Sequence, residues 1–342
     1  MTTRVALVGA GAMGTIMARD IYPQLGGEVE VVAVVDRDPI RAHSLAAPLG
    51  ARPYASLADA LAHEELDAVD IRIPHAGHAD AAVEALDQGL HVLVEKPLAL
   101  TLADCHRVER AAAAAGRMAA VAENYPHLRA VRAARAAIEA GTVGEVLALR
   151  TTRAYTLDGV WAESAWRQGD QPMAGLLWDQ ATHHISLLRA LAGPITAVAA
   201  HRTTRRTTPG AEAYALDLTF DSGLVAQSLY CWGTPSRAVE VEATVLGSQG
   251  MIDVAVDYEA HGGGARLVRG ADVTAISEVE CYYDSHALIV RDWAAAIRGG
   301  GSPLVTPTSA TADVAVVIAA QTSLAAGGAP VQVQTAGAAV SP

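Results

Sequence analysis

The residue with the clearest chemical potential is Lys96, the only lysine in a chain of 342 residues. The other 24 of its 25 lysine and arginine residues are arginines. A guanidinium stays charged at any working pH, whereas a desolvated ammonium can lose and regain a proton. Lys96 is therefore a candidate for acid/base work, and the alternative is a chance survivor of a compositional bias toward arginine.

A second candidate is the pair Asp179 and His183 in the stretch WDQATHH. Residues 178–192 carry leucine and isoleucine at helical spacing, and residues four apart lie on one face of a helix. A carboxylate beside an imidazole suits a general base that takes a proton from a hydroxyl. His184 lies about 100 degrees round the helix and is assigned a structural or surface role. The alternative is a helix-start carboxylate with a half-buried histidine. A metal site is not expected from this pair, because the local sequence offers no third ligand.

A glycine motif follows the first apolar run of the chain. Gly9, Gly11 and Gly14 form GxGxxG between RVALV and a helical pattern, and Asp36 ends the next apolar run, EVEVVAVVD. Such glycines let the backbone approach a pyrophosphate at the helix start, and such a carboxylate accepts from a ribose hydroxyl. Arg37 could meet a 2'-phosphate that Asp36 would repel, so the pattern favours NAD over NADP. The alternative is a glycine-rich turn with an incidental aspartate.

The elements that must position these residues alternate along the first part of the chain. Apolar runs typical of buried strands occupy 4–8, 28–36, 67–74, 91–95 and 118–125. Helical patterns occupy 39–50, 56–66, 78–90 and 101–117, with predicted caps at Ser56 and Thr101 and a predicted end at Gly116. The alternation predicts a doubly wound parallel sheet. Ligands of such a sheet lie beyond the carboxyl ends of its strands, which is where Gly9, Asp36, Pro74, Lys96 and Asn124 fall.

The pattern changes near residue 145 to longer alternating runs separated by turns. These runs occupy 145–156, 195–205, 213–220, 224–232, 239–247, 251–256 and 265–270. They predict a large, mostly antiparallel open sheet. We therefore expect an α/β Rossmann domain over 1–122 and an α+β domain over 123–342 that serves substrate binding and oligomerisation.

Charge and composition exclude several classes of partner. The net charge of −12 and the pI of about 5.4 argue against nucleic acid and against an anionic membrane surface. No stretch offers the about 18 uninterrupted apolar residues of a membrane helix, and the glycine-broken start predicts no signal peptide. The widely spaced Cys105, Cys231 and Cys281 fit a reducing cytoplasm.

With GAGAMG, EKP at 95–97 and WDQATHH in place, the chain resembles the glucose-fructose oxidoreductase / inositol dehydrogenase / MocA family over essentially its whole length. The resemblance implies that Lys96 is catalytic and contacts both the substrate and the nicotinamide ribose, next to a bond that is often cis. It implies that Asp179 and His183 complete the catalytic group. Ser186 stands where many members have a second aspartate, which leaves open the polar network behind the site and the substrate class.

The motifs and the resemblance together predict two sets of contacts. Cofactor contacts are expected from Gly9, Gly11, Ala12, Met13, Gly14, Asp36, Arg37, Pro74, His75, His78, Glu95, Lys96 and Asn124. Substrate contacts are expected from Lys96, Tyr125, Trp166, Arg167, Asp179, His183 and Tyr283.

The resulting hypothesis is a cytoplasmic oxidoreductase that uses NAD, with NADP as the alternative, and no metal. It acts on a secondary alcohol of a sugar or cyclitol, or on the corresponding ketone. In this mechanism His183 receives the hydroxyl proton, Lys96 bonds the same oxygen, and Asp179 orients His183 or a neighbouring hydroxyl. The resemblance implies a homodimer or homotetramer. Two alternatives stay open: a glycosidase that uses NAD for transient oxidation, and a cofactor-dependent sensor without catalysis.

Overall fold

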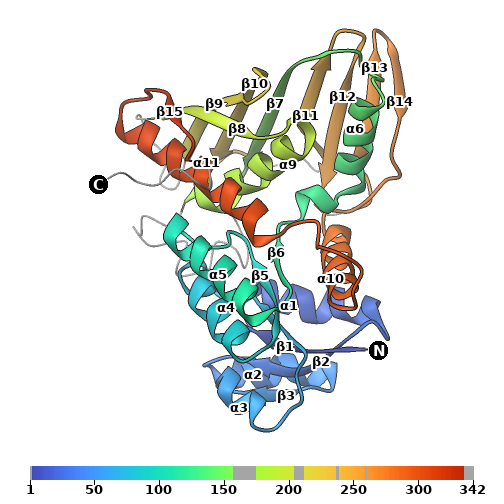
Figure 1. Cartoon of the computed structure of the whole chain (residues 1–342). Coiled ribbons are helices and arrows are strands. Elements are labelled where there is room, and N and C mark those ends of the chain that lie inside the picture. Colours follow the sequence, from blue (N-terminus) through green and yellow to red (C-terminus); the bar gives the residue numbers. More distant parts are fainter. Residues whose placement is uncertain (1, 157–174, 204–211, 236–238, 259, 335–342) are drawn as a thin grey trace. The chain divides into compact units, whose positions relative to one another are not determined.

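The computed structural model describes residues 2–156, 175–203, 212–235, 239–258 and 260–334 (Figure 1). Two compact units divide the chain. The first comprises Met1–Glu123 and His286–Thr311, and the second comprises Asn124–Ser285 and Ala312–Pro342. The break after residue 123 lies next to the expected boundary, whereas 286–311 were expected in the second domain and instead join the first unit.

The first unit is built on a parallel sheet, called here the first sheet, with six strands among the described residues. Its strands are β1 (Thr3–Val8), β2 (Val29–Val35), β3 (Arg52–Tyr54), β4 (Ala68–Ile71), β5 (His91–Glu95) and β6 (Ala119–Ala122). They lie in the order β3-β2-β1-β4-β5-β6, and every neighbouring pair is parallel. β4 and β6 are buried at every position, as strands covered on both faces are. The predicted doubly wound sheet is confirmed.

Three helices of this unit, those that follow Asp38, Ser56 and Thr101, begin at a polar side chain that caps them. The helices of the unit are α1 (Ala12–Ile16), α2 (Pro39–Ala46), α3 (Leu57–Leu61), α4 (His78–Asp87), α5 (Leu102–Ala115) and α10 (Asp284–Ile297). The Ser56 and Thr101 hydroxyls each accept from a backbone N–H at 3.1 Å, which confirms both predicted caps. α5 ends at Gly116 in the left-handed conformation, as predicted. α1 continues as a π-helical turn at Met17–Ile21 and a 3₁₀ turn at Tyr22–Leu25 rather than as one regular helix.

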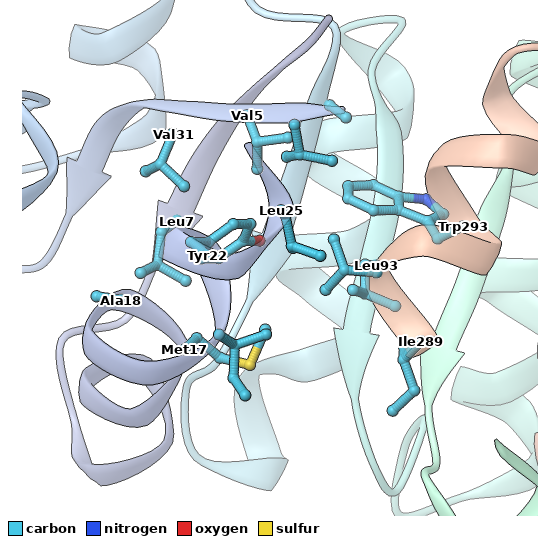
Figure 2. Packing of buried hydrophobic residues seen from close by; sticks show 14 of the residues in the cluster. Val5, Leu7, Met17, Ala18, Tyr22, Leu25, Val31, Leu93, Ile289 and Trp293 are labelled. Atoms are coloured by element: carbon cyan, nitrogen blue, oxygen red, sulfur yellow. The ribbon is translucent and has the colours of Figure 1, made fainter. Parts of the chain in front are cut away.

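The core of the first unit explains why the segment at 286–311 belongs to it. Ile289, Val290 and Trp293 recur at helical spacing on α10 and are buried in the same apolar cluster as Leu93 and Val5. Figure 2 shows Trp293 and Ile289 beside Leu93, with Val5 in the same cluster. The sequence does not show to which unit α10 belongs, because the apolar spacing of a helix predicts a buried face without showing which sheet covers it.

The second unit holds a larger sheet, called here the large sheet, with nine strands in the described part of the chain. Its strands are β7 (Val146–Tyr155), β8 (Ile195–Arg202), β9 (Glu212–Phe220), β10 (Val225–Trp232), β11 (Val239–Gly247), β12 (Gly250–Asp257), β13 (Gly264–Arg269), β14 (Asp272–Ala275) and β15 (Val331–Gln332). The order is β14-β13-β12-β11-β7-β10-β9-β8-β15. Only β7 and β10 pair in parallel within it, so the predicted mostly antiparallel sheet is confirmed.

Helices cover one face of the large sheet. They include α6 (Arg129–Glu139), a π-helical turn at Leu177–Ala181 and α9 (Thr182–Ala192), and α6 and α9 lie on the same side of the sheet in Figure 1. α11 (Pro307–Ala325) begins in the segment assigned to the first unit and ends in the second. No helix within the described ranges is long and apolar enough to cross a membrane.

Strand β11 inverts the usual relation between polarity and burial. Its sequence begins VEVE, yet Glu240 and Glu242 are 8% and 0% exposed. Val239 and Val241 are 38% and 40% exposed. The two glutamates therefore point toward the helix-covered face, and the two valines point away from it. A strand that exposes valine and buries carboxylate has a local conflict of the kind expected where a site is built.

The placement of α10 predicts the effect of removing its aromatic anchor. Trp293→Ala should lower the free energy of unfolding by about 3–5 kcal/mol, because it deletes a fully buried indole and leaves a cavity. Arg291→Ala is the matched control on the same helix, since it removes a surface ion pair with Glu28, worth about 0–1 kcal/mol, and an exposed hydrogen bond to the Gln24 carbonyl oxygen, and it leaves no cavity in the core. Urea unfolding followed by circular dichroism measures both. Equal losses in the two variants would show that Trp293 does not anchor this core.

Candidate active site

The carboxyl ends of the parallel strands bring most of the expected cofactor residues to one edge of the first sheet. Gly9 follows β1, Asp36 follows β2 and Lys96 follows β5. Pro74 is exposed and follows β4, directly before a 3₁₀ turn at His75–Gly77. The strand order reverses between β1 and β4, and ligands of open α/β sheets bind at such a point.

The three glycines of the motif serve two purposes. A Cβ on Gly9, whose φ is +106°, would lie 2.4 Å from the Arg72 carbonyl oxygen. A Cβ on Gly14 would lie 2.0 Å from the Gly9 carbonyl oxygen. Gly11 has an ordinary φ of −81°, and its Cβ position has no described atom within 4 Å. Gly9 and Gly14 thus permit close backbone packing, whereas Gly11 borders the open space that a pyrophosphate would need.

Ala12 and Met13 form the first turn of α1. The Met13 side chain is partly buried and packs against the core of the first unit. The first N–H groups of a helix have no intrahelical acceptor. The backbone N–H groups of these two residues are therefore what they can offer an anionic ligand.

Asp36 is held by its own backbone surroundings. Its Oδ2 accepts from the Ala10 N–H at 2.7 Å, and its Oδ1 accepts from the Asp38 N–H at 2.9 Å. These bonds fix the carboxylate at the end of β2 beside the glycine turn. Each oxygen keeps a further acceptor site, so the carboxylate can still accept from a ribose hydroxyl. Arg37 is exposed.

Lys96 is buried, with 9% of its surface exposed, and the peptide bond that follows it is cis, as the resemblance implied. The preceding Glu95 accepts a hydrogen bond from Arg72 Nη1. Arg72 Nε donates to Asp70 Oδ1 at 2.7 Å, and the Tyr22 hydroxyl donates to Asp70 Oδ2 at 2.8 Å. A buried chain of polar groups therefore leads from the interior of the first unit to the residue beside Lys96.

The charges of this cluster are strongly coupled. Burial raises the pKa of Asp70, although the neighbouring Arg72 opposes that shift. Burial lowers the pKa of Arg72, but Asp70 and Glu95 outweigh it and raise the pKa above its ordinary value. Arg72 therefore remains a cation between two acids.

His78 has both ring nitrogens occupied by backbone carbonyls. Nδ1 lies 2.7 Å from the Pro97 oxygen, and Nε2 lies 2.8 Å from the Ile73 oxygen. The ring is fully buried, and this burial lowers its pKa. These contacts indicate that His78 positions the segment after Lys96 rather than contacting a cofactor directly. His75 is also buried, and its ring lies 5.5 Å from that of His78.

Asn124 opens the second unit rather than lining the first sheet. Its Nδ2 donates to Ser285 Oγ at 2.9 Å, and its Oδ1 accepts from the Tyr282 hydroxyl at 3.3 Å. Asn124 is 1% exposed. Its described bonds hold the Tyr282 region in place, while its expected contact with the cofactor stays a prediction.

Asp179 and His183 are both buried at the start of the α9 region. Asp179 lies in the π-helical turn and His183 in α9, so the helix begins with a wider turn than the regular α-helix expected from the sequence. The His183 ring lies 4.8 Å from the Tyr125 ring and 6.4 Å from the Tyr282 ring. His184 is 1% exposed, so the surface role proposed as one option for it is wrong.

A buried carboxylate that sequence reasoning missed lies behind these rings. Glu242 Oε1 accepts from Arg153 Nη1 at 2.7 Å and from the Tyr258 hydroxyl at 2.5 Å. Glu242 Oε2 accepts from the Tyr125 hydroxyl and contacts His184 Nε2 at 3.1 Å. The Arg153 guanidinium also lies over the Tyr258 ring, 3.8 Å from its centroid. We call these five residues the Glu242 cluster.

The electrostatics of the Glu242 cluster keep its acid ionised. Burial, the largest single effect, raises the pKa of Glu242, but Arg153 and the bonds from His184 and Tyr125 together lower it to about 2. Burial raises the pKa of the Tyr125 and Tyr258 hydroxyls, and the nearby Glu242 charge adds to both shifts. Both tyrosines therefore stay protonated as hydrogen-bond donors.

The remaining expected residues are placed only in part. Trp166 and Arg167 lie outside the described residues. The Tyr283 ring lies 5.3 Å from the Tyr282 ring. Among the described residues, no three His, Cys, Asp or Glu side chains are grouped as metal ligands are. Cys105, Cys231 and Cys281 are free thiols.

The first unit fits a dinucleotide on structural grounds of its own. The open space at Gly11, the N–H groups of the α1 start and the fixed Asp36 carboxylate match the pyrophosphate and ribose of such a group. When bound, NAD supplies a nicotinamide ring that accepts or returns a hydride.

Comparisons with known proteins agree with this geometry. Residues 3–123 match the family model described as the oxidoreductase family with an NAD-binding Rossmann fold. Residues 131–253 match the model described as the GFO/IDH/MocA C-terminal domain.

Among curated proteins, the chain is 27% identical to scyllo-inositol 2-dehydrogenase (NAD(+)) of Bacillus subtilis over 96% of each chain. It is 32% identical to inositol 2-dehydrogenase of Ralstonia nicotianae, over 56% of this chain and only 55% of that enzyme. Among solved structures, levoglucosan dehydrogenase in complex with NADH has the same fold, with a TM-score of 0.83 at 22% identity, over 98% of this chain and 100% of that one. The chain therefore belongs to the Gfo/Idh/MocA family of NAD-binding oxidoreductases.

Proposed function

We propose that this chain oxidises a secondary alcohol of a cyclitol or sugar with NAD, or reduces the corresponding ketone. The observation that carries the proposal is the cofactor edge of the first sheet, where Gly11, Asp36 and Lys96 follow three of its parallel strands. The relatives named for inositol support a substrate with a ring of hydroxyl groups. Residues 157–174 lie outside the described residues, and the substrate is proposed as a class.

In the proposed reaction, NAD, when bound, would supply the acceptor for the hydride of the carbinol carbon, and His183 would receive the hydroxyl proton. Lys96 donates a hydrogen bond to the same oxygen and stabilises the negative charge that develops there in the transition state. Asp179 orients the imidazole or holds a neighbouring hydroxyl. Burial of Lys96, Asp179 and His183 supports these roles, because charge stabilisation is stronger away from water.

We also propose a homodimer or homotetramer assembled through the outer face of the large sheet, opposite α6 and α9. Val225, Leu229, Val241 and Met251 are exposed there, and each alternates with a buried neighbour on its strand. An apolar patch of this kind marks an interaction surface. The free thiols support a reducing compartment, and we propose the cytoplasm.

Turnover across a panel of cyclitols, aldoses and sugar phosphates tests the function directly. With NAD present, at least one polyol should produce reduced nicotinamide, measured by its absorbance. Lys96→Arg should then lower kcat by about 100-fold or more, because the charge stays while the geometry and the proton chemistry change. His183→Gln should lose a similar factor, and His43→Gln, at an exposed histidine, is the control.

NAD affinity, measured by calorimetry, distinguishes a loss of cofactor binding from a loss in the chemical step. His183→Gln should bind NAD within about threefold of the wild-type chain, because its loss lies in the chemical step. Lys96→Arg should lose more in kcat than in NAD affinity, because Lys96 is expected to contact the cofactor as well as the reacting oxygen. Near-wild-type turnover of Lys96→Arg would contradict the role of Lys96. A silent panel with normal NAD binding would contradict the dehydrogenase itself.

The glycine geometry predicts that two alanine substitutions act differently. Gly11→Ala should leave the melting temperature nearly unchanged and weaken NAD binding by about 10-fold or more, because the new methyl group enters the open space. Gly14→Ala should lower stability by about 1–3 kcal/mol, because its methyl group would overlap the Gly9 carbonyl. Thermal melts without cofactor and NAD titrations distinguish the two. Normal NAD affinity in Gly11→Ala would place the pyrophosphate elsewhere.

The cofactor preference rests on the charge of Asp36. Asp36→Asn should raise the affinity for NADP relative to NAD by about 10-fold, because it removes the repulsion of a 2'-phosphate and leaves Arg37 in place. Asp38→Asn is the matched control, since Asp38 caps α2 two residues later. Dissociation constants for both cofactors provide the measurement. An unchanged ratio in Asp36→Asn would show that Asp36 does not face the ribose.

A further inference from the structure

Glu242 has no acceptor capacity left for a substrate. A carboxylate offers about four lone-pair sites, and the Glu242 cluster occupies them with four donors. Two of these lie on Oε1, from Arg153 and Tyr258, and two lie on Oε2, from Tyr125 and His184. The side chain is 0% exposed. Its role must therefore be exerted through the groups that it holds.

The two rings that flank His183, those of Tyr125 and Tyr282, are each connected to the Glu242 carboxylate. The Tyr125 ring packs on the His183 imidazole at 4.8 Å with an angle of 31° between the planes, and its hydroxyl bonds Glu242 directly. The Tyr282 ring meets His183 edge-on at 6.4 Å, and it packs at 4.5 Å on Tyr258. Tyr258 in turn donates to Glu242 at 2.5 Å.

An ionised carboxylate is the group that this arrangement requires. Tyr125 Oη and His184 Nε2 both meet the same oxygen, so that oxygen must be able to accept twice. A glutamine of the same shape would present one oxygen and one NH₂ group, and the NH₂ group would oppose a donor. Tyr125 Oη also lies 2.8 Å from Tyr258 Oη, so in the glutamine variant the two hydroxyls would have to rearrange their bonds around the one remaining oxygen, and the Tyr125 ring would shift with its hydroxyl.

We propose that Glu242 is a positioning residue of the active site, which fixes the Tyr125 ring and through it the orientation of the His183 imidazole. This inference rests on the proposed role of His183 as the base and deepens it. The inverted pattern of β11 supports it independently, because a strand that buried its valines would be easier to fold and would not supply the carboxylate.

The chain offers a matched control on the same strand. Glu240 is also buried and lies 3.7 Å from Arg153 Nη1, and the bonds described for Tyr125 and His184 run to Glu242 instead. Glu242→Gln should lower kcat by about 10- to 100-fold while KM and NAD affinity change by less than about threefold, because only the alignment of the base is lost. Glu240→Gln should change kcat by less than about threefold. Equal losses in the two variants would overturn the proposal in favour of simple charge balance at Arg153.

Tyr125→Phe keeps the test valid if Glu242→Gln folds poorly. It deletes only the hydroxyl, so it should reproduce the fall in kcat, and the double variant should lose no more than the larger single loss. Additive losses would show that Glu242 does not act through Tyr125. Folding is checked by circular dichroism.

The imidazole signals of His183 in heteronuclear NMR give a readout independent of turnover. They should shift or broaden in Glu242→Gln and Tyr125→Phe and stay in place in Glu240→Gln, with assignment by His183→Gln. Unmoved signals in both of the first two variants would overturn the proposal. If the wild-type chain reduced no NAD with any polyol, the proposed function would fail while these signals still tested the positioning.

Discussion

A carboxylate withdrawn from water must be met by donors and by positive charge, and both units of this chain are arranged around that constraint. In the first unit, Asp70 is buried between Tyr22 and Arg72. In the second unit, Glu242 is buried among the tyrosines and Arg153. The device is the same in each: an acid, an arginine and a tyrosine hydroxyl. Removing one partner from such a group leaves an uncompensated buried charge, which costs about 3–5 kcal/mol.

The two clusters differ in how their acids respond to pH. The pKa of Glu242 is lowered to about 2, so its ionised form favours folding. That stability is fully present above the ordinary glutamate pKa and is lost as the pH falls through the lowered value. Burial raises the pKa of Asp70, so its ionisation at neutral pH opposes folding. The first cluster thus keeps a less favourable charge, and it does so on strands that end beside Lys96.

The sequence predicts local structure where the pattern and the environment agree. The strands from β7 to β13 alternate and are found close to their expected bounds, and the caps at Ser56 and Thr101 follow from residue type alone. The π-helical turn before α9 was not predicted, because its bonding leaves no mark in the apolar spacing. That α10 packs in the core of the first unit could not be predicted, because this depends on tertiary contacts that the local sequence does not encode.

Two groups of buried charged residues were missed, for different reasons. Alternation in VEVE predicts valines inside and glutamates outside, which is the reverse of what β11 adopts. Asp70 and Arg72, two apart in an otherwise apolar run, carry a signal that could have been used: charges at alternate positions of a strand buried on both faces need partners. Lys96 stood out because its rarity in this chain is independent of any pattern, and its catalytic role stays a prediction.

The inversion of β11 ties the site to the outer face of the sheet. Side chains alternate along a strand, so the register that turns Glu240 and Glu242 inward also turns Val239 and Val241 outward. A slip by one residue would bury Val239 and Val241 and expose both acids. Two conditions oppose the slip. The donors of the Glu242 cluster require a carboxylate on the helix-covered face of the sheet. A second copy packed on the outer face would bury Val239 and Val241 there, so that a slip would gain nothing by burying them. Assembly of copies through that face would therefore stabilise the same register that holds Tyr125 against His183.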